Sequence, residues 1–248
     1  MPEVRPVKIA HDELQAFREQ GFVRLGPVAP VHVIEELCRR IDEIMMGEVV
    51  YPNMLMQLCP SAGRPESFEQ TRTFKGRSLN YRKIQDLEQD PLFLDYLSSP
   101  LFRDICLRII GRRVSIYRAM FFNKPAEQGV TINWHADGVG DWADDWDLDI
   151  PPAFSLWTAL DASRMENGCL RIIPGSHIRR LASRNSRPST SEIEAQVPPA
   201  ERLHLEMEAG EVVLLDNRTL HTSGTNRTDC PRRAFSVCYI DSETRDTT

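Results

Sequence analysis

The stretch VSIYRAMFFN, residues 114–123, is rich in the β-branched and aromatic residues that favour strands. Similar short runs follow it along the chain, and Gly, Pro, Asn and Asp residues separate them. We therefore predict that residues 112–241 form a β-sandwich or barrel of the jelly-roll type. The later runs are FSLWTAL (154–160), CLRII (169–173), EVVLLD (211–216) and AFSVCYI (234–240).

The residues before this region follow a helical spacing. HDELQAFREQ (11–20) is predicted to be a short helix, with a short strand FVRL after it. Apolar residues recur at helical intervals over 31–46, and residues 90–111 suggest two further short helices, after an irregular stretch that extends to about residue 80. We expect residues 1–111 to be mainly helical and to cover one face or end of the β-rich core.

At 248 residues, a single domain spanning 1–248 is the default expectation. Three polar segments stand apart from the predicted core. Residues 183–199 are predicted to form a mobile surface loop, and residues 242–248 a flexible tail. The acidic segment 138–152, which holds two tryptophans, is a candidate lid suited to a cationic substrate.

The overall composition is that of an ordinary globular protein, with 41% apolar residues, 27% charged residues and a net charge of -6. This balance argues against a nucleic-acid partner. The sequence shows no apolar run of signal-peptide or membrane-spanning length, so we expect a cytoplasmic protein without a membrane partner. The six cysteines include no C-x-x-C pair, which argues against a zinc ribbon. The oligomeric state is not indicated.

The segment NWHADG, residues 133–138, contains a histidine and an aspartate two positions apart. In a strand, residues i and i+2 project to the same face, so His135 and Asp137 can present an imidazole and a carboxylate to one point. Metal ions use both kinds of ligand, but the same pair also occurs in turns and strands without any metal. The pair alone does not decide between these interpretations.

His221 offers a third ligand, because it follows a buried-looking strand in the segment LLDNRTLHTSG, residues 214–224. Two histidines and one carboxylate on one face of a metal leave three positions open, and this arrangement is typical of non-haem Fe(II) oxygenases. The alternative for His221 is a hydrogen-bonded histidine at the end of a strand.

The run CPRRAFSVCYI, residues 230–240, contains two consecutive arginines, and a strand points them to opposite faces. The face with small residues is the better cavity wall, so Arg232 is a candidate anchor for a carboxylate, the alternative being an ordinary surface arginine. The face of Arg232 also carries small residues, Ala234, Ser236 and Cys238. The face of Arg233 carries bulky residues, Phe235, Val237 and Tyr239.

Read together, the segments WHAD, NGCLRIIPGSH and HTSGTNRTDCPRRA resemble the phytanoyl-CoA dioxygenase (PhyH-like) family of Fe(II)/2-oxoglutarate-dependent oxygenases. YRKIQD and MFFNKP extend the likeness, so that it spans about residues 80–240. The resemblance implies a double-stranded β-helix, a cupin-like variety of jelly roll, which agrees with the fold predicted from the strands.

The resemblance also implies a role for each matched residue. His135, Asp137 and His221 would be the catalytic iron ligands, and Arg232 would pair with the distal carboxylate of 2-oxoglutarate. Other residues that match the cosubstrate pocket of the family are Ser223, Lys83, Met120, Asn123 and Trp157.

The implied reaction consumes O2 and 2-oxoglutarate, releases succinate and CO2, and hydroxylates an organic substrate. The family name suggests an acyl-CoA, whose phosphates Arg179, Arg180, Arg184 and Arg187 could contact. The acidic segment 138–152 would repel those phosphates, so we expect a small or mid-sized metabolite that is not linked to CoA.

Three other functions compete with this hydroxylase. One is an acyl-CoA 2-hydroxylase of the same family, and another is a sensor that binds metal or 2-oxoglutarate without turnover. The third is a zinc hydrolase with the same three ligands. Arg232 and Ser223 argue against the hydrolase, because hydrolysis needs no anchor for a dicarboxylate, whereas the ligands of a sensor could be identical.

Overall fold

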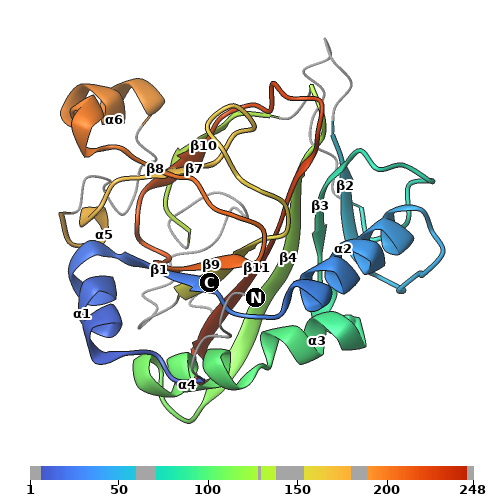
Figure 1. The fold of residues 1–248 in the computed structure, drawn as a ribbon, viewed down its shortest axis with the longest axis horizontal. Helices are drawn as coiled ribbons and strands as arrows, with labels where there is room; N and C mark the ends of the chain where they lie inside the picture. Colours follow the sequence, from blue (N-terminus) through green and yellow to red (C-terminus); the bar gives the residue numbers. More distant parts are fainter. Residues whose placement is uncertain (1–6, 60–70, 128–129, 138–153, 180–188, 245–248) are drawn as a thin grey trace.

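The computed structural model describes residues 7–59, 71–127, 130–137, 154–179 and 189–244, and two antiparallel sheets form its centre (Figure 1). The described strands are β1 (Phe22–Pro27), β2 (Leu55–Leu58), β3 (Tyr81–Gln85), β4 (Val114–Lys124), β5 (Ile132–His135), β6 (Phe154–Ala159), β7 (Leu170–Ile172), β8 (Leu203–Leu205), β9 (Glu211–Asp216), β10 (His221–Ser223) and β11 (Arg232–Asp241). The described helices are α1 (His11–Gln20), α2 (Val31–Met45), α3 (Pro91–Leu97), α4 (Pro100–Ile109), α5 (Ser176–Arg179) and α6 (Thr190–Gln196), with short 3-10 turns η1 (Leu87–Gln89) and η2 (Pro199–Glu201).

The strands from β4 to β11 build a jelly roll. The larger sheet has the order β1-β9-β6-β11-β4-β3-β2 and the smaller sheet has the order β5-β10-β7-β8, so that the chain passes repeatedly from one sheet to the other. The last strand, β11, lies between β4 and β6, where Ala234 is opposite both Phe122 and Ala159. This connectivity confirms the predicted double-stranded β-helix.

The two faces of the larger sheet have different partners. On β11, Phe235, Val237 and Tyr239 are buried in the main hydrophobic cluster with residues of α1 to α4. Ala234, on the opposite face, belongs to a smaller cluster inside the roll with Trp157. The alternation of a strand thus assigns one face of this sheet to the helices and the other to the interior.

The N-terminal helices have the predicted positions, and Figure 1 shows α2, α3 and α4 gathered on one side of the sheets. Asp90 fixes the start of α3, because its Oδ1 accepts hydrogen bonds from the amides of Leu92 and Phe93. Its Oδ2 accepts bonds from Arg40 on α2 and from Tyr51, which ties these elements together. None of the described helices is both long and apolar enough to cross a membrane.

The structure differs from the sequence prediction in two segments. The stretch predicted to be irregular contains β2, which with β3 extends the larger sheet beyond β4. The prediction of a mobile loop over 183–199 was wrong for its second half, where α6 forms. Ile193 and Val197 are fully buried there against Trp134 of the smaller sheet. Residues 183–188, and the tail beyond residue 244, lie outside the described residues.

Candidate active site

Two antiparallel strands of the smaller sheet bring the candidate histidines together. In the pairing of β5 with β10, His135 is opposite His221, and the centroids of their rings are 4.1 Å apart. Asp137 follows β5, with carboxylate oxygens 3.7 Å from Nε2 of His135 and 3.9 Å from Nε2 of His221. One ligand atom from each of the three residues lies within 4.8 Å of the others.

Backbone carbonyl groups set the tautomer of both histidines. Nδ1 of His135 lies 2.8 Å from the carbonyl oxygen of Asn133, and Nδ1 of His221 lies 2.9 Å from that of Thr219. Because a carbonyl oxygen only accepts hydrogen bonds, each Nδ1 carries a proton, and Nε2 is the ring nitrogen that faces Asp137 and is available to a metal ion. A donor set of two imidazoles and one carboxylate fits Fe(II).

The charge of Asp137 suits a metal ligand. Burial by itself raises the pKa of this carboxyl group, but the two histidines, Arg118 and Lys83 outweigh burial and lower the pKa below its ordinary value. Asp137 therefore remains a carboxylate at neutral pH, and the cluster carries the negative charge that a divalent cation needs.

A cavity of about 130 Å3 lies beside the three residues, between the two sheets. Every residue that the sequence assigned to the site lines this cavity, although the residues come from strands far apart in the sequence. They are Lys83 on β3, Met120 and Asn123 on β4, His135 on β5, Asp137 after it, Trp157 on β6, His221 and Ser223 on β10, and Arg232 on β11.

Arg232 is a buried cation with an unused donor. Its side chain is 3% exposed, Nη2 donates to the carbonyl oxygen of Gly168 at 3.2 Å, and Nε has no hydrogen-bond partner among the described residues. The guanidinium carbon lies 5.6 Å from the ring centroid of Trp157. Burial lowers the pKa of Arg232 to about 10. A carboxylate in the cavity would satisfy this side chain, so the residues present fit 2-oxoglutarate.

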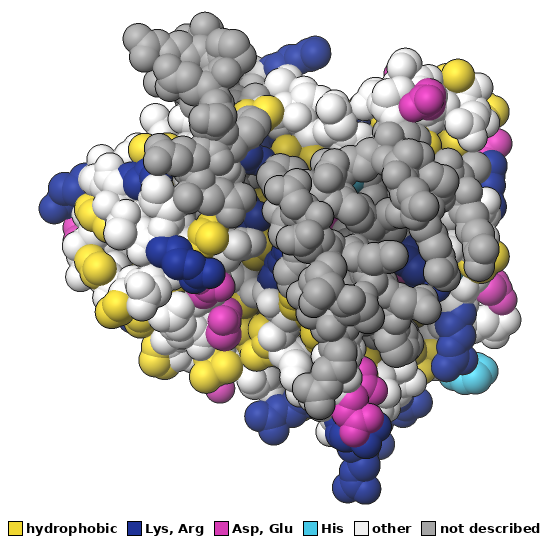
Figure 2. Space-filling model, turned by 180° about the vertical axis from the view of Figure 1, so that it is seen from behind, with side chains coloured by type: hydrophobic (Ala, Val, Ile, Leu, Met, Phe, Trp, Pro, Cys, Tyr) yellow, Lys and Arg dark blue, Asp and Glu magenta, His cyan; other side chains and the backbone are white. Residues whose placement is uncertain are grey.

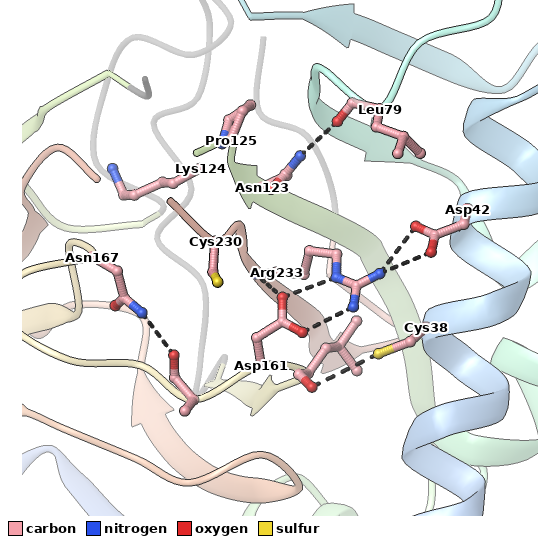
Figure 3. A network of polar contacts seen from close by, with 12 residues as sticks. Cys38, Asp42, Leu79, Asn123, Lys124, Pro125, Asp161, Asn167, Cys230 and Arg233 are labelled. Carbon is pink, nitrogen blue, oxygen red and sulfur yellow. Dashed lines mark hydrogen bonds and ion pairs between the residues drawn. The ribbon is translucent and has the colours of Figure 1, made fainter. Parts of the chain in front are cut away.

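Two other predicted residues take different positions in the wall. Burial, with the charges of Arg118 and Arg82, lowers the pKa of Lys83 to about 8. Asn123 donates from Nδ2 to the carbonyl oxygen of Leu79 at 3.1 Å (Figure 3). It also donates to the carbonyl oxygen of Tyr81 at 3.0 Å. These bonds direct the Asn123 amide group towards the chain at the start of β3, so it supports the wall and does not offer its donor to the cavity.

Basic residues that the sequence reasoning missed also line the cavity. Lys124 is buried, and its Nζ donates to the carbonyl oxygen of Val130 at 2.7 Å. Burial and the charge of Arg232 lower its pKa to about 6. Arg118 and Phe122 also line the cavity from β4. Their even spacing from Met120 was a signal, because it places all of them on one face of a strand. The remaining cation is Arg82 on β3.

Arg233, the neighbour of Arg232, anchors the same strand to the helices (Figure 3). Its Nε and Nη2 donate to the two carboxylate oxygens of Asp161, each at 2.9 Å, and its backbone amide donates to Asp161 at the same distance. Its Nη1 donates to both carboxylate oxygens of Asp42 on α2, at 3.0 and 3.1 Å. The start of β11, where Arg232 lies, is thereby fixed in position.

The chain is similar to proteins of known fold. Its TM-score is 0.73 with the crystal structure of EctD from S. alaskensis with 2-oxoglutarate and 5-hydroxyectoine, at 20% identity over 96% of this chain and 78% of that one. With the non-heme alpha ketoglutarate dependent carbocyclase SnoK from nogalamycin biosynthesis the TM-score is 0.71, at 22% identity over 94% of this chain and 84% of that one. These likenesses show a shared jelly-roll fold.

Sequence comparison is more specific. A probable phytanoyl-CoA dioxygenase from Caenorhabditis elegans is 25% identical over 95% of this chain and 76% of its own length. The model of the phytanoyl-CoA dioxygenase (PhyH) family matches residues 17–234, which include all the residues of the candidate site. The chain therefore belongs to the phytanoyl-CoA dioxygenase family of Fe(II)/2-oxoglutarate-dependent oxygenases.

Proposed function

We propose that this protein hydroxylates a small or mid-sized organic metabolite, with His135, Asp137 and His221 as the ligands of Fe(II) and Arg232 as the anchor of 2-oxoglutarate. The observation that supports this proposal is the position of three ligand atoms within 4.8 Å of one another, in a cavity that also holds a buried guanidinium group. Ser223, Lys83, Met120 and Trp157 complete the cosubstrate wall, and Asn123 supports it.

When bound, Fe(II) and 2-oxoglutarate supply the oxidising chemistry, in which O2 and 2-oxoglutarate are converted to succinate and CO2 as the substrate gains a hydroxyl group. The residues of this chain determine the geometry. The Asn133 and Thr219 carbonyls orient His135 and His221, and Arg232 fixes the far end of the dicarboxylate. Burial of Arg232 and Trp157 keeps water from that end of the cavity.

A substrate without CoA is part of this proposal. Of the four arginines suggested as phosphate contacts, Arg179 forms an ion pair with Glu201 at 2.7 Å, and the others lie outside the described residues. We also assign the whole chain to a single domain in the cytoplasm. The packing of α1 to α4 and the larger sheet in one hydrophobic cluster supports the single domain. Recovery of the full chain with organelles in cell fractionation would contradict the location.

One anaerobic titration tests the proposed ligands. Addition of Fe(II) and 2-oxoglutarate should give a metal-to-ligand charge-transfer band, which His135→Ala should abolish and Arg232→Met should shift to much higher 2-oxoglutarate concentration. Admission of O2 with a panel of metabolites and acyl-CoA thioesters should then release succinate in step with a hydroxylated product. Absence of the band would refute the metal site, whereas a band without any coupled product would favour a sensor.

A further inference from the structure

The charge of the cavity points to a property of the substrate. The chain has a net charge of -6, and charged side chains of both signs are mixed with apolar ones on the face in Figure 2. In contrast, the described lining of the cavity carries one carboxylate, Asp137, and several cations. The cations are Arg82, Lys83, Arg118 and Arg232, whereas Lys124, with a pKa of about 6, is mainly neutral at pH 7.

The charges of Arg232 and Arg118 lie at two separate levels along β4. Lys124 is the cross-strand partner of Arg232, so both belong to the end where the distal carboxylate of 2-oxoglutarate would lie. Arg118 is six residues from Lys124 on the same strand, so that their Cα atoms are about 20 Å apart. The five carbons of 2-oxoglutarate cannot span that distance, because each C–C bond is only about 1.5 Å long. Arg118 is therefore not needed to bind the distal carboxylate.

Arg118 lies at the metal end of the cavity. It is the partner of Cys238 on β11, which in turn pairs with Ser155 on β6, another residue of the lining. It also lines the same cavity as the proposed metal ligands His135, Asp137 and His221. A substrate must present its C–H bond at this end, because the other end is filled by the cosubstrate.

A β-bulge next to Arg118 orients its side chain. The register of β4 with β11 passes from Arg118 opposite Cys238 directly to Ile116 opposite Tyr239, so Tyr117 is the extra residue. Bulges break the alternation of faces and redirect side chains near active sites. Here Nη2 of Arg118 donates to the Tyr117 hydroxyl at 2.9 Å, and the guanidinium carbon lies 4.7 Å from the centroid of the Tyr117 ring. The guanidinium group is thus held in a defined orientation.

We infer that Arg118 determines substrate specificity by binding an anionic group, a carboxylate or a phosphate, on the molecule that is hydroxylated. This inference rests on the proposed function. A guanidinium group matches both anions through two parallel hydrogen bonds. The acidic segment 138–152, which suggested a cationic substrate, lies outside the described residues, and the described lining favours the opposite charge.

The test uses the anaerobic Fe(II)·2-oxoglutarate complex of the full chain and four probes with the same six-carbon chain. These are hexanoate, hexyl phosphate, hexan-1-ol and hexylamine. Binding is measured by calorimetry and by perturbation of the charge-transfer band. At least one of the two anions should bind more tightly than both the alcohol and the amine, and the tighter of the two identifies the anionic group of the substrate.

Variants then assign the preference to Arg118. Arg118→Gln should weaken binding of the preferred anion about tenfold to a hundredfold, and Arg118→Lys should weaken it less. Arg113→Gln, which removes an equal charge from an exposed residue before the same strand, should have no effect. All variants should keep the charge-transfer band, which shows that they fold and bind the cosubstrate.

Two results would overturn the inference. One is the absence of any preference for anions in the wild type, including the case in which no probe binds. The other is a preference that persists in Arg118→Gln. Loss of the charge-transfer band in the wild-type protein would instead refute the proposed function, so the two failures are distinguishable.

Discussion

Arg232 and Arg233 are consecutive on β11, yet their guanidinium groups lie on opposite sides of the larger sheet. Arg232 lines the cavity and retains an Nε–H without a partner among the described residues, whereas Arg233 is bound to Asp161 and Asp42. Burial alone would lower the pKa of Arg233, but its carboxylate partners raise that pKa above the ordinary value. One arginine is thus satisfied within the fold, and its neighbour is left to bind a ligand.

Replacement of Arg232 by Met should separate stability from binding. Burial of the Arg232 charge without a bound carboxylate lowers the free energy of unfolding, in agreement with the lowered pKa of this residue. Arg232→Met should therefore leave the melting temperature of the ligand-free protein unchanged or higher. The same change should weaken 2-oxoglutarate binding about a hundredfold, because it removes contacts that contribute about 3 kcal/mol. Calorimetry and thermal unfolding, each with and without 2-oxoglutarate, measure both effects.

Arg113→Met is the control for this variant, since the Arg113 side chain is 62% exposed. It should alter neither the melting temperature nor the affinity. A marked fall in the melting temperature of Arg232→Met, with unchanged 2-oxoglutarate affinity, would show that Arg232 is a structural residue.

Asp161 should affect the binding of 2-oxoglutarate indirectly, because it binds Arg233, the neighbour of Arg232. Asp161→Asn removes the charge that holds Arg233, and should lower the free energy of unfolding by about 2 kcal/mol. It should also raise the dissociation constant of 2-oxoglutarate severalfold, because Arg232 loses its fixed backbone, while the affinity for Fe(II) stays unchanged. Equilibrium unfolding and metal titration are the measurements.

Asp42→Asn provides the matched comparison, because Asp42 is 43% exposed and its loss leaves the bonds to Asp161 in place. It should cost less than about 1 kcal/mol. Equal effects of the two variants on 2-oxoglutarate affinity would contradict a positioning role for Asp161.

The strand alternation made much of this site predictable from the sequence. The parity of β11 assigned Arg232 to the face of small residues, the better cavity wall, and Arg233 to the face of bulky residues. The structure places Arg232 in the cavity wall and Arg233 on the side of the helices. The position of Lys83 in the cavity wall was not predictable in this way. It depends on the pairing of β3 with β4, which places Lys83 opposite Phe122, a residue distant in the sequence. No local pattern specifies which strand extends a sheet at its edge, so that wall could be assigned only by resemblance to the family.

Helix α6 shows a second kind of failure. Its sequence is polar apart from a few positions, and the segment was predicted to be a loop. The signals for a helix were present, namely a capping box from Ser189 to Glu192 and a pair of apolar residues four apart, Ile193 and Val197. So short a helix is stabilised mainly by tertiary packing, here against Trp134, and the sequence does not reveal that contact.

Gly168 should be required for the geometry around Arg232. Its φ is 81°, and a Cβ atom would lie 2.5 Å from the carbonyl oxygen of Gly224 and 2.9 Å from Cδ of Lys124. Gly168→Ala should therefore destabilise the protein by about 2–4 kcal/mol, from the left-handed backbone and the clash together. It should also weaken 2-oxoglutarate binding, because the Gly168 carbonyl group accepts a hydrogen bond from Arg232.

Gly26→Ala isolates the backbone contribution. Gly26 has a φ of 70°, but an added Cβ would meet nothing within 4 Å. This variant should lose only about 1 kcal/mol and should bind 2-oxoglutarate normally. Chemical denaturation of both variants gives the difference, and equal losses would mean that the close approach at Gly168 does not matter.

Lys83 should make 2-oxoglutarate binding depend on pH. Burial, followed by the charges of Arg118 and Arg82, lowers the pKa of Lys83 to about 8 in the ligand-free protein. The ammonium form attracts the dianion, and the dianion in turn raises the pKa of Lys83 in the complex. The contribution of Lys83 to the affinity should therefore be constant below about pH 8 and should fall above it, by up to tenfold per pH unit, until the pKa of Lys83 in the complex is reached. Calorimetric titrations of 2-oxoglutarate from pH 6.5 to 9.5 measure this profile.

Two variants assign the pH dependence to Lys83. Lys83→Arg keeps a positive charge over the whole range, so its affinity should not fall near pH 8. Lys83→Met should bind weakly at every pH, with a flat profile, because no group at this position titrates. A fall in affinity near pH 8 that persists in both variants would assign the titration to another group of the cavity and would exclude direct charge pairing between Lys83 and the cosubstrate.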